Sequence, residues 1–182
     1  MTGRRLFAGL SRFARDRRAL GAVEFALTAP FMILLYLGGA QLMDAISVYR
    51  KVVLADRTLS DVTTQYVSIS SAQIGTILDG AKQVMTPYTT ANMTMVVTQI
   101  YIDKDGKTNI SWTKSNDGTT IKAADLDVPT DIAQPDTYIV LSQITYRYQP
   151  RIAASLIGPI TFSDHIYMNP RRSNSVDCTD CA

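Results

Sequence analysis

Histidine and cysteine are scarce in this chain of 182 residues, which holds one histidine and two cysteines. A structural zinc site takes four protein ligands. His165, Cys178 and Cys181 supply at most three of them, so we expect no metal site.

Catalytic signatures are also missing from the sequence. There is no G-x-S-x-G, no P-loop, no G-x-G-x-x-G and no H-E-x-x-H, the signatures of several hydrolase, nucleotide-binding, dehydrogenase and metalloprotease classes. His165 lies in a strand-like pattern without a nucleophile motif, so we interpret it as a surface or packed residue. The loop from Asp103 to Gly106 lacks the spaced oxygen ligands of an EF-hand. We expect neither enzymatic activity nor a cofactor.

Formal charge is absent from Phe25 to Met43, a run of 19 residues. At 1.5 Å per residue, a helix of this length spans roughly the 30 Å hydrocarbon core of a bilayer. The run continues into a helix-compatible stretch, residues 44–62, without the small-residue cleavage site of a secretory signal. We therefore predict one retained transmembrane helix over residues 20–43, in contact with membrane lipid.

Charge of one sign dominates the segment before this run. Six arginines face a single acidic residue, Asp16, between Met1 and Arg18, whereas 12 basic residues face 14 acidic ones from Asp44 onward. Because arginines flanking an apolar span favour the cytoplasm, we expect a cytoplasmic leader, residues 1–19, and an outer domain beginning at Asp44. Because membrane topology already accounts for the arginines, we expect no nucleic-acid partner.

Glu24 directly precedes the apolar run, at its predicted cytoplasmic end. An ionised carboxylate inside a membrane costs about 2 to 3 kcal/mol unless it is solvated or paired. One interpretation is that Glu24 reaches the interface beside Arg17 and Arg18. The other is that it meets a positive group on a neighbouring subunit, such as a free α-amino terminus.

The segment Arg17–Leu27, with the sequence RRALGAVEFAL, is followed by Pro30 and the apolar run. This pattern resembles a class III prepilin signal, and the match is to TadE-like minor pilins of the tight adherence (Tad) branch of type IV pilus systems. A basic Pro-Arg stretch near the end of the chain, Asn169–Arg172, is similar to the ending of that family.

The resemblance implies a processing site. In the family, a prepilin peptidase cuts after a small residue, usually glycine, five residues before a glutamate that an aromatic residue commonly follows. Glu24 and Phe25 supply that pair, which places the cut between Ala19 and Leu20. Ala19 stands where glycine is usual, and a cut after Gly21 remains the alternative register.

The resemblance also implies the partners and the location. These are the prepilin peptidase, other pilin and minor pilin subunits, and the assembly platform of the bacterial inner membrane. Glu24 would pair with the new amino group of Leu20 on an adjacent subunit, and the outer domain would be periplasmic or carried into an extracellular pilus, acting in pilus biogenesis and adhesion. The rival hypothesis is an uncleaved single-pass anchor or sensor whose outer domain binds a ligand. Its leader is too short for a signalling domain, so this hypothesis would require a separate membrane partner.

The outer domain, residues 44–168, has two periodicities. Apolar residues at helical spacing predict that the first helix continues to about Tyr66 and that a second helix follows, and alternating residues predict four strands. The predicted ranges are Ala72–Met85 for the second helix and Met93–Ile102, Thr108–Lys114, Tyr138–Tyr148 and Thr161–Met168 for the strands. We therefore predict an α+β, pilin-like fold in which a long N-terminal helix packs on a small antiparallel sheet.

Two connections and the C-terminal tail complete the sequence-based prediction. Asp105-Gly106 is typical of a two-residue hairpin turn, and residues 115–134 are predicted to form a long exposed loop. Cys178 and Cys181, in a tail of residues 169–182, are expected to form a disulfide within one chain or between chains outside the cytoplasm. An intrachain bond closes too short a loop to add much stability. A redox-active role would need a neighbouring helix, which the tail does not indicate.

Overall fold

The computed structural model describes residues 18–152, 154 and 158–181. Residues 1–17 of the predicted leader therefore lie outside the described residues. Contacts divide the chain after Met43 into two units, residues 1–43 and 44–182, and each is described by itself.

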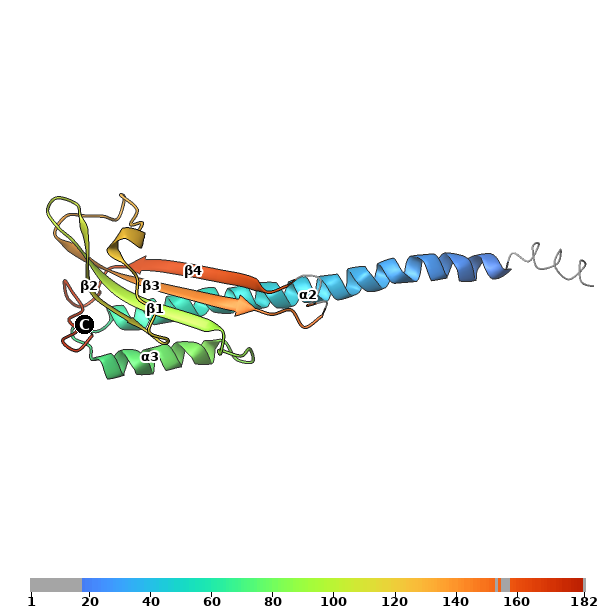
Figure 1. Ribbon diagram of the computed structural model, residues 1–182, viewed down its shortest axis with the longest axis horizontal. Helices are drawn as coiled ribbons and strands as arrows, with labels where there is room; N and C mark the ends of the chain where they lie inside the picture. Colours follow the sequence, from blue (N-terminus) through green and yellow to red (C-terminus); the bar gives the residue numbers. More distant parts are fainter. Residues whose placement is uncertain (1–17, 153, 155–157, 182) are drawn as a thin grey trace, which may run out of the picture. The chain divides into compact units, whose positions relative to one another are not determined.

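The fold is α+β, as predicted, with one long apolar N-terminal helix and a four-stranded antiparallel sheet (Figure 1). The helices are α2 (Arg18–Thr64), α3 (Ser71–Val84) and the short 3-10 helix η1 (Ala123–Asp125). The strands are β1 (Met93–Ile102), β2 (Thr108–Ser115), β3 (Thr137–Tyr148) and β4 (Ile160–Met168). The predicted strands are confirmed to within one residue at each end, because their alternating pattern matches the two faces of the sheet.

The first unit holds residues 18–43 of α2. Its apolar side chains are exposed, with Leu34 at 68%, Leu35 at 72% and Tyr36 at 77% of their full surface. By length and composition, the helix is able to cross a membrane. Pro30 lies inside it and cannot donate the usual main-chain hydrogen bond.

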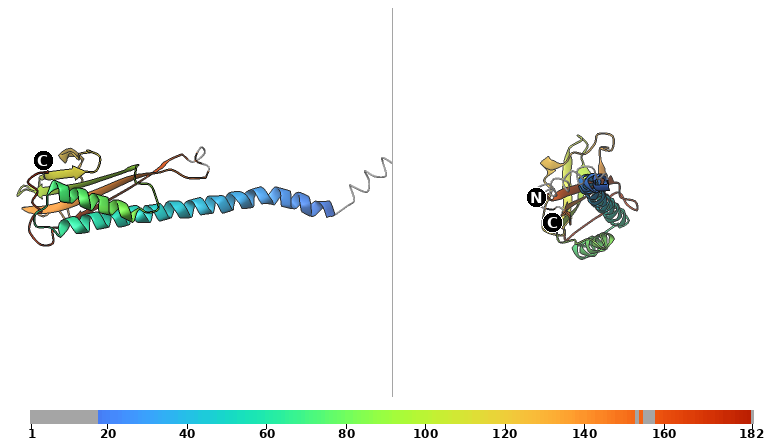
Figure 2. Two further views of the ribbon diagram at one scale, coloured as in Figure 1. Left: turned by 90° about the horizontal axis from the view of Figure 1, so that it is seen from below. Right: turned by 90° about the vertical axis from the view of Figure 1, so that its right-hand side faces the viewer.

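The second unit places both helices on one face of the sheet. Residues 44–64 of α2 and helix α3 lie side by side against the strands (Figures 1 and 2). Buried residues from α2, Val48, Val52, Ala55 and Leu59, recur at helical spacing. They meet α3 and the sheet in one apolar cluster, so the periodicity that predicted this part of the helix marks the core.

The sheet has the order β2-β1-β3-β4, and every neighbouring pair is antiparallel. In the central pair, Val97 of β1 lies opposite Ser142 of β3. The strands β2 and β4 form the two edges.

The turn between β1 and β2 differs from the prediction. It spans residues 103–107, and Gly106 has a positive φ of 78° whereas Asp105 does not. The Asp103 carboxylate accepts from the main-chain N–H groups of Asp105 and Lys107, at 2.9 and 2.8 Å. The predicted hairpin is confirmed. Its turn is longer than two residues, because the Asp103 side chain organises a loop that needs one left-handed residue.

Most of the segment 115–134 is exposed, as predicted, although some of its apolar residues pack on the sheet. It contains η1, and Ile121, Leu126 and Val128 pack against a second apolar cluster on the other face of the sheet. That cluster consists of Ile100, Ile102, Ile139 and Leu141. The segment covers these side chains because they would otherwise leave apolar surface in water.

The tail, residues 169–181, is packed into the second unit. Val176 is fully buried and Cys181 is 3% exposed in the main core. Asp177 forms an isolated parallel bridge with Ser68, and its carbonyl accepts from the N–H of Ile69 at 2.9 Å. The tail therefore belongs to the same packed unit as the sheet.

Candidate functional site

The N-terminal motif lies on the first turns of α2. Ala19 and Leu20 are both helical, and Leu20 is 67% and Phe25 72% exposed. Leu20 and Glu24 are four residues apart, which places them on one side of a helix. The structure thus brings the predicted processing site and the predicted assembly residue within one helical turn.

Glu24 is exposed and forms no ion pair with any side chain that the structure describes. Its main-chain carbonyl accepts from the Thr28 hydroxyl at 3.0 Å, and the carbonyl of Phe25 does so at 3.3 Å. These bonds engage the backbone only, so the carboxylate stays available to a group outside the described residues.

Asp44, the first residue after the apolar run, is held by two tyrosines. Its Oδ2 accepts from the Tyr148 hydroxyl at 2.6 Å and its Oδ1 from the Tyr88 hydroxyl at 2.7 Å. These two hydrogen bonds hold the pKa of Asp44 below its ordinary value. Helix α2 is therefore fixed here to the end of β3 and to the loop after α3. Sequence reasoning used Asp44 only as a boundary, because its partners lie 44 and 104 residues away.

Asp56 is a fully buried acid on the sheet-facing side of α2. Neither of its carboxylate oxygens has a hydrogen-bond partner, and the hydroxyl of Ser60, one turn further, has none either. The hydroxyl of Ser142 of β3 donates to the main-chain carbonyl of Asp56, at 3.4 Å. Burial raises the pKa of Asp56 to about 7; the Ser142 hydroxyl opposes this rise, and the carboxylate of Asp164 adds to it. The carboxyl group is thus protonated below neutral pH, which sequence reasoning did not identify.

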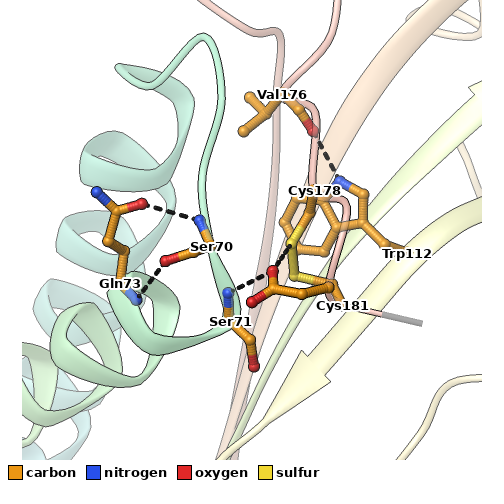
Figure 3. Close-up of a disulfide and its surroundings, with 8 residues drawn as sticks. Ser70, Ser71, Gln73, Trp112, Val176, Cys178 and Cys181 are labelled. Atoms are coloured by element: carbon orange, nitrogen blue, oxygen red, sulfur yellow. Dashed lines mark hydrogen bonds between the residues drawn. A yellow bond between two sulfur atoms is a disulfide. The ribbon is translucent and has the colours of Figure 1, made fainter.

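The two cysteines are joined by a disulfide within one chain (Figure 3). Beside it, the N-terminus of α3 is closed by a capping box between Ser70 and Gln73. The N–H of Ser71 donates to Asp180 Oδ1 at 2.8 Å. A helix therefore neighbours the cysteines, although the sequence of the tail did not indicate one. Ser70-x-x-Gln73 is a capping pattern visible in the sequence, whereas its proximity to Asp180 required the fold.

The tail is tied to the sheet just before the disulfide. Trp112 Nε1 donates to the carbonyl of Val176 at 2.8 Å (Figure 3). The N–H of Val176 donates in turn to Gln99 Oε1 at 2.6 Å. These bonds satisfy both main-chain groups of a buried residue, which would be costly to leave unpaired.

Cys178, Asp180 and Cys181 are the one group of metal-ligand residues close together in the described part of the chain. Zinc binds cysteine as a thiolate, and both sulfurs are already bonded to each other. The oxidised pair therefore does not fit a zinc site. His165 lies exposed on β4, with its ring edge-on to Tyr167 at 5.8 Å between centroids.

Comparisons of the chain with protein-family models, with curated proteins and with solved structures found no match. Function is therefore inferred from the N-terminal motif and from the geometry of the described residues.

Proposed function

We propose that this protein is a minor pilin-like subunit of a Tad-type pilus assembly machinery. It is made as a membrane-bound precursor, cut by a prepilin peptidase between Ala19 and Leu20, and incorporated into a pilus through its N-terminal helix. The observation that carries the proposal is the uncharged run Phe25–Met43, which lies within α2 directly after Glu24 and exposes its apolar side chains. Exposed apolar surface of this extent needs a cover of lipid or other helices.

Glu24 has the assembly role in this proposal. Cleavage creates a positively charged amino group on Leu20, and a buried carboxylate is tolerated when an opposite charge lies close. Within one helix, the amino group of Leu20 and the carboxylate of Glu24 are one turn apart. A pairing within one helix cannot align two helices. We therefore propose that Glu24 pairs with the amino group of Leu20 on a neighbouring subunit.

The proposed topology follows the arginines. The leader stays in the cytoplasm beside the inner membrane, the run from Leu20 to Met43 crosses it, and the unit from Asp44 onward lies outside. The partners are then the peptidase and assembly platform in the membrane and other pilin subunits along the helix.

Substitutions at two small residues test the cleavage register. Ala19→Phe places a bulky side chain at the proposed cut, so we expect loss of processing when the variant is produced with its prepilin peptidase. Gly21→Phe is the matched control, since a Cβ at Gly21 meets no atom within 4 Å. Processing of the Gly21 variant to a chain starting at Leu20 supports the proposed site. Normal processing of Ala19→Phe would exclude it.

Glu24→Ala and Glu24→Gln test the assembly role. Both remove the charge, and glutamine keeps the shape of the side chain. We expect both variants to be cleaved and both to lower the amount of assembled pili in shear fractions. Pili at wild-type level in Glu24→Gln would contradict the charge pairing, whereas uncleaved wild-type protein would instead favour the membrane-anchored binding domain.

A further inference from the structure

The two cysteines of the tail differ in exposure. Cys178 is partly exposed, whereas Cys181 is 3% exposed and belongs to the main core. Cys181 also borders a groove along β2, lined in part by Lys114 and Thr119, but little of its own surface is open there. A large reagent therefore reaches Cys178 more readily than Cys181.

We propose that the Cys178–Cys181 pair is a modification site, oxidised by a disulfide-bearing oxidant after the tail has docked, with Cys178 reacting first and Cys181 completing the bond. This inference is independent of the pilin function, because it uses only contacts within the second unit.

The tail has enough contacts to dock before the disulfide forms. Both main-chain groups of Val176 are bonded to the sheet side chains Gln99 and Trp112. The main chain of Asp177 is bonded on both sides as well, to Val67 at 3.1 Å and to Ile69 at 2.9 Å. These bonds fix the residue next to Cys178. In the oxidised structure the two cysteine Cα atoms are 5.5 Å apart, within the usual range for a disulfide.

The exchange proceeds in two steps. The Cys178 thiolate attacks one sulfur of the oxidant's disulfide, forms a mixed disulfide and releases the other sulfur as a thiolate. The Cys181 thiolate then attacks the Cys178 sulfur, forms the intrachain bond and releases the remaining oxidant sulfur. Two electrons pass to the oxidant, which leaves as a dithiol once it takes up the two protons lost by the cysteines.

Asp180 makes the pair a substrate of such exchange rather than its agent. Cysteines of disulfide oxidoreductases are activated when a helix N-terminus stabilises the thiolate. Here the first N–H of α3, on Ser71, is taken by Asp180 Oδ1. The same oxygen lies 3.4 Å from Cys178 Sγ, so Asp180 stands between the helix N-terminus and that sulfur. The oxidised pair thus holds Asp180 on the helix and Cys181 in the core.

Thiol labelling of the full-length protein tests the inference without any substitution. The chain is reduced in detergent micelles, treated briefly with iodoacetamide, and mapped by peptide mass spectrometry. We expect Cys178 to be alkylated about tenfold faster than Cys181 or more, because docking protects the buried sulfur. In urea, the two rates should become similar. Equal rates in the folded protein would overturn the inference.

Oxidised glutathione then tests the order of the two steps. We expect Cys181→Ser to accumulate a glutathione mixed disulfide on Cys178, and Cys178→Ser to accumulate about tenfold less on Cys181. Adding Val176→Asp to Cys178→Ser removes an anchor of the tail, and modification of Cys181 should rise. Rapid modification of Cys181 in Cys178→Ser without that change would contradict the proposed order.

Discussion

Glu24 and Asp56 lie in the two parts of one helix, and neither carboxylate is paired with a described side chain, for opposite physical reasons. Glu24 is exposed and borders an apolar surface that no described residue of its unit covers. Asp56 is fully buried, because the sheet covers its side of α2. The first carboxylate is therefore accessible for the proposed pairing with another subunit, whereas the second avoids the cost of burial by taking up a proton.

The apolar residues of the two parts of α2 show the same contrast in exposure. Leu34 and Leu35 are 68% and 72% exposed, whereas Val48 and Val52 are fully buried. In the second part, the chain supplies its own cover. In the first part, no described residue supplies it, and in the proposed function the cover is lipid or other subunits.

The largest expected effect concerns Asp56. The folded protein holds the proton of Asp56 up to about pH 7, whereas the ordinary pKa of an aspartate carboxyl group is 3.8. Below about pH 4, Asp56 does not reduce the free energy of unfolding. As the pH rises to 7, the free energy of unfolding falls by about 4 kcal/mol in all, and above pH 7 it stays at that lower value. Asp56→Asn should remove this loss, so chemical denaturation in micelles should find the variant more stable than wild type at pH 8.

A comparison between pH values isolates the titration of Asp56. The advantage of Asp56→Asn over wild type should be larger at pH 8 than at pH 5 by about 3 kcal/mol. Asp79→Asn, on the exposed side of α3, is the control and should change stability by less than about 1 kcal/mol at either pH. An equal advantage of Asp56→Asn at both pH values would show that the carboxyl group does not titrate as described.

The second effect contrasts two leucines of α2. Leu59 is fully buried and Leu54 is 55% exposed. Leu59→Ala should lower the free energy of unfolding by about 3 kcal/mol, because it removes packed methyl groups and leaves a cavity. Leu54→Ala should lower it by about 0.5 kcal/mol or less. Similar losses in urea denaturation would break the distinction between the two sides of the helix.

The third effect concerns the first part of α2. Leu35→Arg places a charge in the middle of the apolar run, at a cost of about 2.5 kcal/mol for a helix in the bilayer. We expect a smaller share of this variant in the membrane fraction, with Leu54→Arg as the matched control outside the run. Unchanged membrane association of Leu35→Arg would contradict a spanning role for this segment.

The smallest effect is at the junction between the two parts. Tyr148→Phe removes the 2.6 Å bond to Asp44 and leaves the bond from Tyr88. We expect a loss of about 1 to 2 kcal/mol in the free energy of unfolding at pH 7. Because the hydrogen bonds lower the pKa of Asp44, the difference from wild type should shrink as the pH falls through the range where Asp44 is protonated. A pH-independent difference would show that the charge on Asp44 is not involved.

Local patterns predicted most of the regular structure. The strand Met93–Ile102 and the buried spacing of Val48, Val52 and Leu59 follow from residues near one another in sequence. The packing of the tail was harder to predict, because most of its residues are polar. Its one buried valine, Val176, is bonded to Gln99 and Trp112, which are far away in the sequence. The partners of Asp44 and the cover over Asp56 depend on similar long-range packing.

The N-terminus of the mature protein tests the central claim most directly. Intact-mass analysis and N-terminal sequencing should compare the wild-type chain produced with and without its prepilin peptidase. We predict a chain starting at Leu20 only when the peptidase is present. A chain that still starts at Met1 beside an active peptidase would contradict the proposed pilin-like function.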